Sequence, residues 1–325
     1  MTEFIIRRLT QSIGVLLIMS ILVFVGVFAI GDPVEVLINP DATQAEVEQM
    51  TEDLGLDKPV WEQYFIFLTN VVKGNLGNSF VFNEPALKLI LSHAPATLEL
   101  AFISMLFAII IGVPLGMYAG FKPDSLVSKS IMGGSIFGFS LPPFWVALMI
   151  IFVFSVKLGW LPASGRGETV DLFGIPVSFL TWDGLTHLIL PAFSLGLLRL
   201  SLMIRLARAG TYENLMMDYV KFARAKGLSD MRVIMGHILK NIMIPIVTIS
   251  GLELGNTIAF AVITETIYAW PGMGKLVIDA IGVLDRPVIV AYLMLVVVMF
   301  IFINFVVDLL YSVLDPRVRL GDLKS

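Results

Sequence analysis

Long runs of apolar residues, separated by shorter polar segments, are the main pattern of this sequence. Six of the runs are long enough to cross the hydrocarbon core of a bilayer, which is about 30 Å thick and needs about 20 residues of α-helix. We therefore predict an all-α polytopic membrane protein with six transmembrane helices. Their expected bounds are Leu9–Ile30, Thr97–Gly120, Ser130–Val156, Leu185–Leu206, Ile242–Ile263 and Val288–Leu314.

Prolines and glycines are expected to interrupt two of these spans. Pro142 and Pro143 lie within the third span, and Gly112, Pro114 and Gly116 lie within the second. Proline removes a backbone hydrogen bond and kinks a helix. Each break is therefore either a bend at which a gate moves or a kink that packing alone requires.

The connections on one side of the membrane are large. Between the first two spans, Thr43–Leu54 and Val60–Val72 have helical spacing, and Pro59 stands where prolines precede helices. The second stretch is apolar and aromatic, which predicts an amphipathic pair or a small cap on the membrane surface. A further connection, Lys157–Gly184, is rich in glycine and proline and is predicted to be irregular.

These assignments divide the chain into three parts. Residues 1–30 hold the N-terminal end and the first span, and residues 31–96 form an external amphipathic region. Residues 97–325 form the core with the other five spans. Within the core, the polar loop 208–240 leaves the membrane.

The composition agrees with a membrane protein and excludes several kinds of site. Hydrophobic residues make up 57% of the chain and charged residues 15%, against roughly 25% charged residues in soluble domains. The sequence has no cysteine, which excludes disulfides, thiolate metal sites and cysteine nucleophiles. The histidines His93, His187 and His237 are too scattered to suggest a metal cluster. We expect no metal site, no catalytic residue and no nucleic-acid partner.

Four groups of basic residues flank the spans on the same side. They cluster at the N-terminus, between the second and third spans, between the fourth and fifth spans, and at the C-terminus. With six spans, all four groups fall on the same side of the membrane. Since cytoplasmic loops are enriched in lysine and arginine, both termini are predicted to be cytoplasmic, and residues 31–96 external. The residues are Arg7, Arg8, Lys122, Lys129, Arg208, Lys221, Arg224, Lys226, Arg232, Lys240, Arg317, Arg319 and Lys324.

The loop between the fourth and fifth spans contains a short, basic, helix-prone stretch. Met216, Val220, Ala223 and Gly227 recur there at the spacing of one helical face. The small residues Ala223 and Gly227 would let the surface of another protein approach closely. The alternative is a positively charged loop whose lysines and arginines only meet lipid headgroups.

The stretch Asp218–Ser229, followed by Asn241 and Pro245, resembles the coupling loop of ABC importer permeases. The general pattern in that family is Glu-Ala-Ala, three residues and then Gly, with a Leu-Pro further on. Here Lys221 and Phe222 replace the Glu and the first Ala, and Pro245 comes later than the pattern places it. The oligopeptide/dipeptide-type branch is similar in these departures. Six further blocks in order resemble the same branch: Leu54–Tyr64, Gly74–Gly77, Thr97–Leu100, Leu158–Gly165, Thr264–Gly274 and Val307–Arg317.

The resemblance implies a permease subunit of an importer in the bacterial inner membrane, with ATP hydrolysed elsewhere. The nearest approach to a phosphate-binding loop is Gly274-Lys275, which lacks the leading Gly and the final Ser or Thr and is expected in an external turn. The implied partners are a second, similar permease, two cytoplasmic ATPases that bind ATP and Mg²⁺, and an external substrate-binding protein. The residues implied to dock the ATPase are Asp218, Tyr219, Val220, Lys221, Ala223, Arg224, Ala225, Lys226, Gly227 and Leu228.

Three polar residues are expected within the membrane on or near the translocation path. A charge such as Glu253 costs about 2.5–3.5 kcal/mol at the centre of a span, so it should face the bundle interior, water or a partner charge. Arg199 in the fourth span is the candidate partner, and Asn256 lies one turn from Glu253. Either Glu253 favours a cationic group such as a peptide N-terminus, or it makes a structural bond or stays protonated. Asp308 is expected to be structural.

Two other functions fit the sequence less well. An ion-coupled secondary transporter using Glu253 should show inverted repeats and paired discontinuous helices, and we find no repeat. An intramembrane enzyme needs a His/Glu metal motif or a nucleophile with its base in facing spans. The resemblance favours di- and oligopeptide substrates, although selectivity in such systems resides largely in the binding protein.

Overall fold

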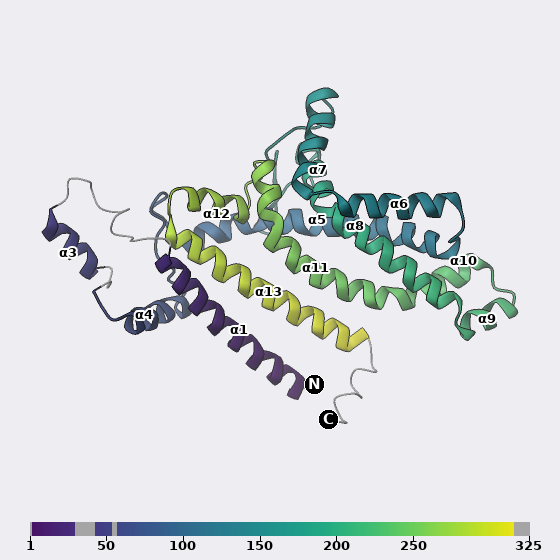
Figure 1. The fold of residues 1–325 in the computed structure, drawn as a ribbon, viewed down its shortest axis with the longest axis horizontal. Coiled ribbons are helices and arrows are strands. Elements are labelled where there is room, and N and C mark those ends of the chain that lie inside the picture. The colour runs from purple at the N-terminus through teal and green to yellow at the C-terminus, as the bar shows by residue number, and fades with distance from the viewer. Residues whose placement is uncertain (1, 30–42, 54–56, 315–325) are drawn as a thin grey trace. The chain divides into compact units, whose positions relative to one another are not determined.

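The chain is almost entirely helical. The structure is a computed structural model and describes residues 2–29, 43–53 and 57–314 of the 325-residue sequence (Figure 1). Five helices are long and apolar enough to cross a membrane, and a bent helix pair brings the number of spans to six if it counts as one. The predicted all-α class with membrane spans is confirmed. The five long helices are α1 (Thr2–Ala29), α5 (Ala86–Phe121), α8 (Trp182–Leu215), α11 (Leu239–Ile267) and α13 (Arg286–Leu314).

The third predicted span, Ser130–Val156, is a bent pair and not one helix. The chain bends by 105° between its two arms. Leu141 and Pro142 have extended backbones at the bend, and Pro143 then takes the first position of a new helix, which suits its fixed φ angle. The interruption at the two prolines is thus confirmed, and the single continuous helix is wrong. The pieces are α6 (Leu126–Ser140), α7 (Pro143–Ile150) and the π-helical turn η1 (Ile151–Lys157).

The second predicted span runs without a break through its glycines. α5 continues as one helix through Pro114, so Gly112, Pro114 and Gly116 do not end it, and a kink there stays a prediction. The glycines instead let α5 and α8 approach closely. A Cβ atom on Gly112 would lie 2.8 Å from the Cβ atom of Met203, and one on Gly116 would overlap the carbonyl oxygen of Ile204. Small residues at such contacts are typical of helix packing in membranes.

Shorter elements occupy the connections. α3 and α4 confirm the two helical stretches predicted after the first span. Gly274 and Lys275, expected in a turn, lie in the first turn of α12. The short elements are α3 (Gln44–Asp53), α4 (Val60–Val72), β1 (Val170–Leu172), β2 (Ile175–Val177), α9 (Asp218–Ala225), α10 (Asp230–Val233), the π-helical turn η2 (Ile234–Ile238) and α12 (Met273–Gly282).

The connection Lys157–Gly184 contains a β-hairpin, so the expectation that it is irregular is wrong there. β1 and β2 pair antiparallel, with Val170 opposite Val177. Phe173 and Gly174 form the two-residue turn, both with positive φ (55° and 84°). Two positive φ angles in succession are what a tight hairpin turn of this kind requires.

Some predicted features lie outside the described residues. These are the last residue of the first predicted span, residues 54–56 of the first external block, the end of the last family block and the basic residues Arg317, Arg319 and Lys324.

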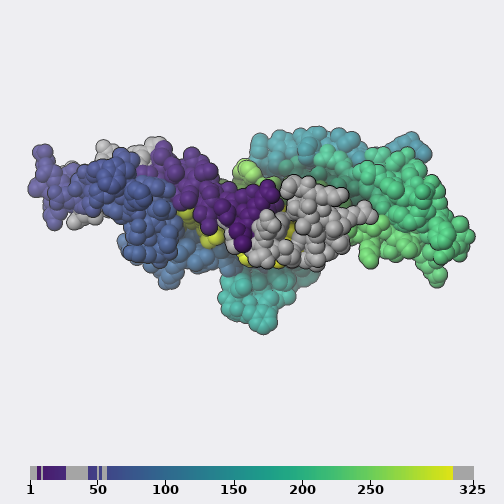
Figure 2. Space-filling model, turned by 90° about the horizontal axis from the view of Figure 1, so that it is seen from below, coloured from purple at the N-terminus to yellow at the C-terminus, as the bar shows by residue number. Residues whose placement is uncertain are grey.

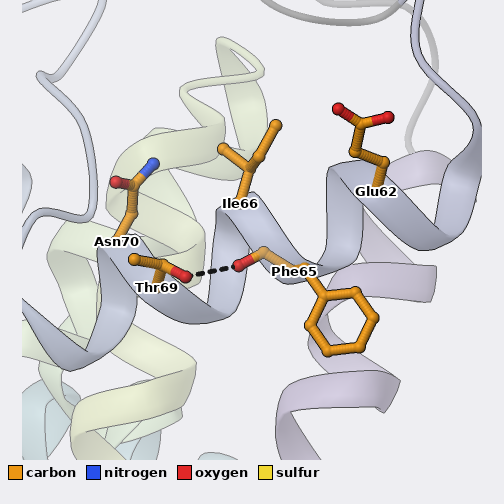
Figure 3. A pocket seen from close by; sticks show the side chains of 5 residues that line it. All are labelled: Glu62, Phe65, Ile66, Thr69 and Asn70. Atoms are coloured by element: carbon orange, nitrogen blue, oxygen red, sulfur yellow. Dashed lines mark hydrogen bonds between the residues drawn. The ribbon is translucent and has the colours of Figure 1, made fainter.

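The described chain divides into two compact units. The first comprises Met1–Pro95 with Gly272–Ile301, and the second comprises Ala96–Pro271 with Phe302–Ser325. In the first unit, α4 packs on α1 through Tyr64, whose ring centroid is 5.4 Å from that of Phe24. The other side of α4 carries a shallow hollow, lined by side chains of that one helix (Figure 3). The lining residues are Glu62, Phe65, Ile66, Thr69 and Asn70. The candidate sites lie in the second unit.

Candidate functional site

α9 is a separate short helix because the chain changes direction at both of its ends. Met217 before it is extended, and Asp218 in its first turn forms an ion pair with Lys221 at 2.9 Å, which lowers the pKa of the Asp218 carboxyl. A negative charge at this end suits the helix dipole. Gly227 after α9 has a φ of +79°, a conformation that glycine adopts without strain, and its N–H donates to the Arg224 carbonyl at 2.9 Å.

The face of α9 that contains Val220 and Ala223 is covered by this chain. Val220 has no exposed surface, and Ala223 is buried with it in a cluster that includes Val233, Ile238 and Ile242. The expectation that Ala223 lets another protein approach is therefore wrong. At Gly227, the described residues leave open space where a Cβ would stand, and its positive φ favours glycine.

The opposite face of α9 is uncovered within the described part of the second unit. Phe222 at its centre is 62% exposed. The ammonium of Lys226 lies 4.5 Å from the centre of the Phe222 ring, and Arg224 pairs with Asp230 of α10 at 3.1 Å. The α9–α10 segment, drawn in green, forms one end of its unit (Figure 2). This surface combines exposed apolar side chains with positive charge. The other exposed apolar residues here are Met216, Met217, Met231 and Met235.

The polar residues predicted within the membrane also meet. The Nε atom of Arg199, near the middle of α8, lies 3.6 Å from Oε2 of Glu253, near the middle of α11. The side-chain amide of Asn256 donates to Oε1 of Glu253 at 3.4 Å. The Arg199 side chain is 10% exposed and that of Glu253 is 27% exposed. The carboxylate therefore faces accessible space, with the guanidinium behind it.

The second unit holds two further buried carboxylates that the sequence does not single out by chemistry. Glu99 of α5 accepts hydrogen bonds from Arg166 and from the backbone N–H groups of Ser178 and Phe179. Glu265 of α11 has no exposed surface and accepts from the hydroxyl of Thr97 at 2.6 Å. Glu99 stands inside the predicted span Thr97–Gly120, and Glu265 lies two residues beyond the predicted span Ile242–Ile263. A charge within or next to an apolar run is the signal that could have found them.

The sequence matches two regions of one protein family, which together cover almost the whole chain. Residues 1–101 match the N-terminal region, and residues 112–320 the main region, of the family described as binding-protein-dependent transport system inner membrane component. The chain belongs to this family. It is a permease, the membrane subunit of an ABC importer, and its transport depends on ATPase and binding-protein partners.

Relatives of this permease match it over almost their full length. It is 41% identical to the di/tripeptide transport system permease protein DppB of Pseudomonas aeruginosa, with 98% of this chain and 99% of that protein covered. It is 38% identical to the oligopeptide transport system permease protein AppB of Bacillus subtilis, over 98% of this chain and 100% of the relative. The glutathione transport system permease protein GsiC of Escherichia coli is 36% identical, with 98% of this chain and 99% of that protein covered.

A solved structure supports the fold of the permease. A chain of the MetNI methionine ABC transporter in an inward-facing conformation superimposes with a TM-score of 0.55 at 17% identity. The match covers 71% of this permease and 99% of that chain. At this identity the likeness shows the fold alone, and family membership decides against an ion-coupled secondary transporter.

Proposed function

We propose that this permease forms half of the membrane path of a peptide importer. A second, similar permease supplies the other half, an external binding protein delivers the substrate, and two ATPases act on the cytoplasmic side. Support for peptides comes from the relatives, of which those named for di-, tri- or oligopeptide transport are 37–41% identical over 98% of this chain. Lysine and arginine around α9 support a cytoplasmic position for that helix.

The single observation that carries the coupling role is the two-sided environment of α9. One face is buried in the second unit through Val220 and Ala223, and the other presents Phe222 among exposed methionines and cations. An exposed apolar centre with a charged rim is the anatomy of a protein-binding surface. Methionine side chains adapt to the partner's shape. An ATPase bound to the exposed face of α9 would move the spans against which its buried face packs.

In the membrane, we propose that Glu253 and Asn256 face the path, with Arg199 holding the carboxylate in place. The greater exposure of Glu253 supports this assignment. A partly exposed carboxylate attracts the ammonium group of a peptide N-terminus. Because Arg199 is paired with the same carboxylate, the site carries little net charge when it is empty.

The test of docking replaces Phe222 by aspartate. Phe222→Asp puts a carboxylate into the centre of the exposed face without touching the buried one. The matched control is Phe173→Asp, since Phe173 is 97% exposed in the hairpin at the other end of α8. Both variants are expressed with the full set of partner subunits and purified in mild detergent. The amount of each ATPase subunit bound per permease is then measured.

We expect Phe222→Asp to release the ATPase subunits and Phe173→Asp to keep them. Central apolar residues of an interface commonly account for about 2 kcal/mol or more of the binding free energy, which corresponds to a loss of affinity of roughly 30-fold. Retention of the ATPases by Phe222→Asp at the wild-type level would contradict docking on this face.

A further inference from the structure

Three polar side chains from three helices meet beside α9. The hydroxyl of Tyr219 donates to Oδ1 of Asn214 in the last turn of α8, at 2.5 Å. The side-chain amide of Asn241, in the first turn of α11, donates to the Tyr219 oxygen at 2.9 Å. The amide of Asn214 donates in turn to the Gly210 carbonyl at 2.7 Å. The Tyr219 hydroxyl thus donates to Asn214 and accepts from Asn241. Oδ1 of Asn214 also accepts a longer bond from the Asn241 amide, at 3.4 Å.

The other attachments of α9 to the spans are apolar. Val220 and Ala223 pack in the buried cluster described above. These contacts place the Val220 face of α9 against the spans, but they include no directional bond to α8 or α11. Its ion pairs do not reach the spans, because Lys221 pairs with Asp218 of the same helix and Arg224 with Asp230 of α10. Within the described chain, Tyr219 is the residue of α9 whose side chain hydrogen-bonds to α8 and α11.

The covalent route from α9 to α11 is irregular. It passes through α10, only four residues long, and then through the π-helical turn η2. In η2, the described residues outside this turn leave open space where a Cβ on Gly236 would stand. A π-helical turn breaks the regular α-helical bonding and is often found at functional sites. Asn241 lies beyond η2, so its bond to Tyr219 joins α9 to α11 directly and bypasses this turn.

We propose that Tyr219 is a positioning residue that fixes the orientation of α9 to α8 and α11 together, so that a displacement of α9 moves both spans as one. The inference rests on the proposed docking of the ATPases on α9. It adds a specific claim. The hydroxyl of Tyr219 transmits the movement of α9 to α8 and α11, and it does not contribute to binding of the ATPases. Tyr219→Phe removes this oxygen and keeps the ring that lies 6.5 Å from the ring of His237.

The experiment uses the complete transporter in lipid nanodiscs with its binding protein. The control is Tyr212→Phe, the same chemical change at a half-exposed tyrosine of α8 whose hydroxyl makes no hydrogen bond within the described residues. Four quantities are measured: the ATPase subunits bound per permease, basal ATP hydrolysis, its stimulation by the binding protein, and deuterium exchange of the amides of residues 218–225.

Tyr219→Phe keeps the ring and removes only the hydroxyl that bonds to Asn214 and Asn241, so we expect the ATPases to stay bound. Stimulation by the binding protein should fall severalfold, and amide exchange in α9 should rise roughly tenfold, since two hydrogen bonds are lost. Asn241→Leu removes the bond to α11 and leaves Tyr219 bonded to Asn214, so its effect should be smaller. The double variant should match Tyr219→Phe, because the Tyr219 hydroxyl takes part in both bonds.

Equal stimulation and equal exchange in Tyr219→Phe and Tyr212→Phe would overturn the inference. Loss of the bound ATPases from Tyr219→Phe would also overturn it, because the hydroxyl would then act in docking. Absence of ATPases from the wild-type permease is a different result, since it would contradict the proposed function itself.

Discussion

The carboxylate of Glu99 and the guanidinium of Arg166 form a buried ion pair that fastens the β-hairpin to α5. Nε of Arg166 lies 3.1 Å from Oε2 of Glu99, and the side chains are 11% and 2% exposed. The other carboxylate oxygen accepts from Ser178 and Phe179, which follow β2, and the guanidinium also donates to the Pro176 carbonyl. One carboxylate thus holds both ends of the hairpin.

Glu99→Gln should destabilise the permease strongly. The amide cannot balance the charge of Arg166, and breaking a buried ion pair from one side costs about 3–5 kcal/mol. Thermal unfolding in detergent should show a midpoint several degrees lower. The control is Glu168→Gln at an exposed carboxylate of the same connection. If the midpoints of the two variants agree, the ion pair does not hold the hairpin.

A valine at Gly116 should prevent α5 from packing on α8. Its Cβ would overlap the Ile204 carbonyl and lie 2.8 Å from the Cβ of Ala207. Such overpacking costs about 1–3 kcal/mol or more. Gly134→Val in α6 is the matched control, since the described residues outside its own helix leave open space at that Cβ position. We expect the yield of monodisperse protein to fall only for Gly116→Val. Equal yields would mean that the close approach is not needed for folding.

The pairing of Asp218 with Lys221 predicts a pH effect on the start of α9. The nearby ammonium lowers the pKa of Asp218 in the folded state below its value in the unfolded chain. The stabilisation is therefore present above the unfolded pKa and lost as the pH falls through the folded pKa. Because the pair is exposed, the effect is small and screened by salt. Lys221→Met should raise the pKa of Asp218, as followed by carbon NMR of its labelled carboxyl. An unchanged titration would exclude the pairing in solution.

The apolar runs were sufficient to predict the spans, but not where their helices end. α8 begins before the predicted Leu185 and continues beyond Leu206, because hydropathy reports the part of a helix inside the membrane and the helix extends into water. The hairpin was missed since its glycines, which allow the turn, are also common in irregular loops. The 105° bend depends on the backbone of Leu141, which composition does not reveal.

The site residues show the same division between local and tertiary information. Periodicity placed Val220 and Ala223 on one face of α9 correctly, but it could not tell which face the rest of the chain covers. Arg199 and Glu253 were paired because two opposite charges in apolar spans must find partners. Glu99 and Arg166 lie 67 positions apart in sequence, and only the folded hairpin brings them together.

Glu253 provides the sharpest test of the translocation path. If its carboxylate meets the N-terminal ammonium of a peptide, Glu253→Gln should weaken the import of trialanine and affect N-acetyl-trialanine much less. A lost charge-assisted hydrogen bond of about 1.5–3 kcal/mol corresponds to a decrease of roughly 10- to 100-fold. The measurement is the ratio of the two uptake rates in proteoliposomes with the same binding protein, so that its own preference cancels between wild type and variant. An equal fall for both peptides would mean that Glu253 only holds Arg199 and α8 in place.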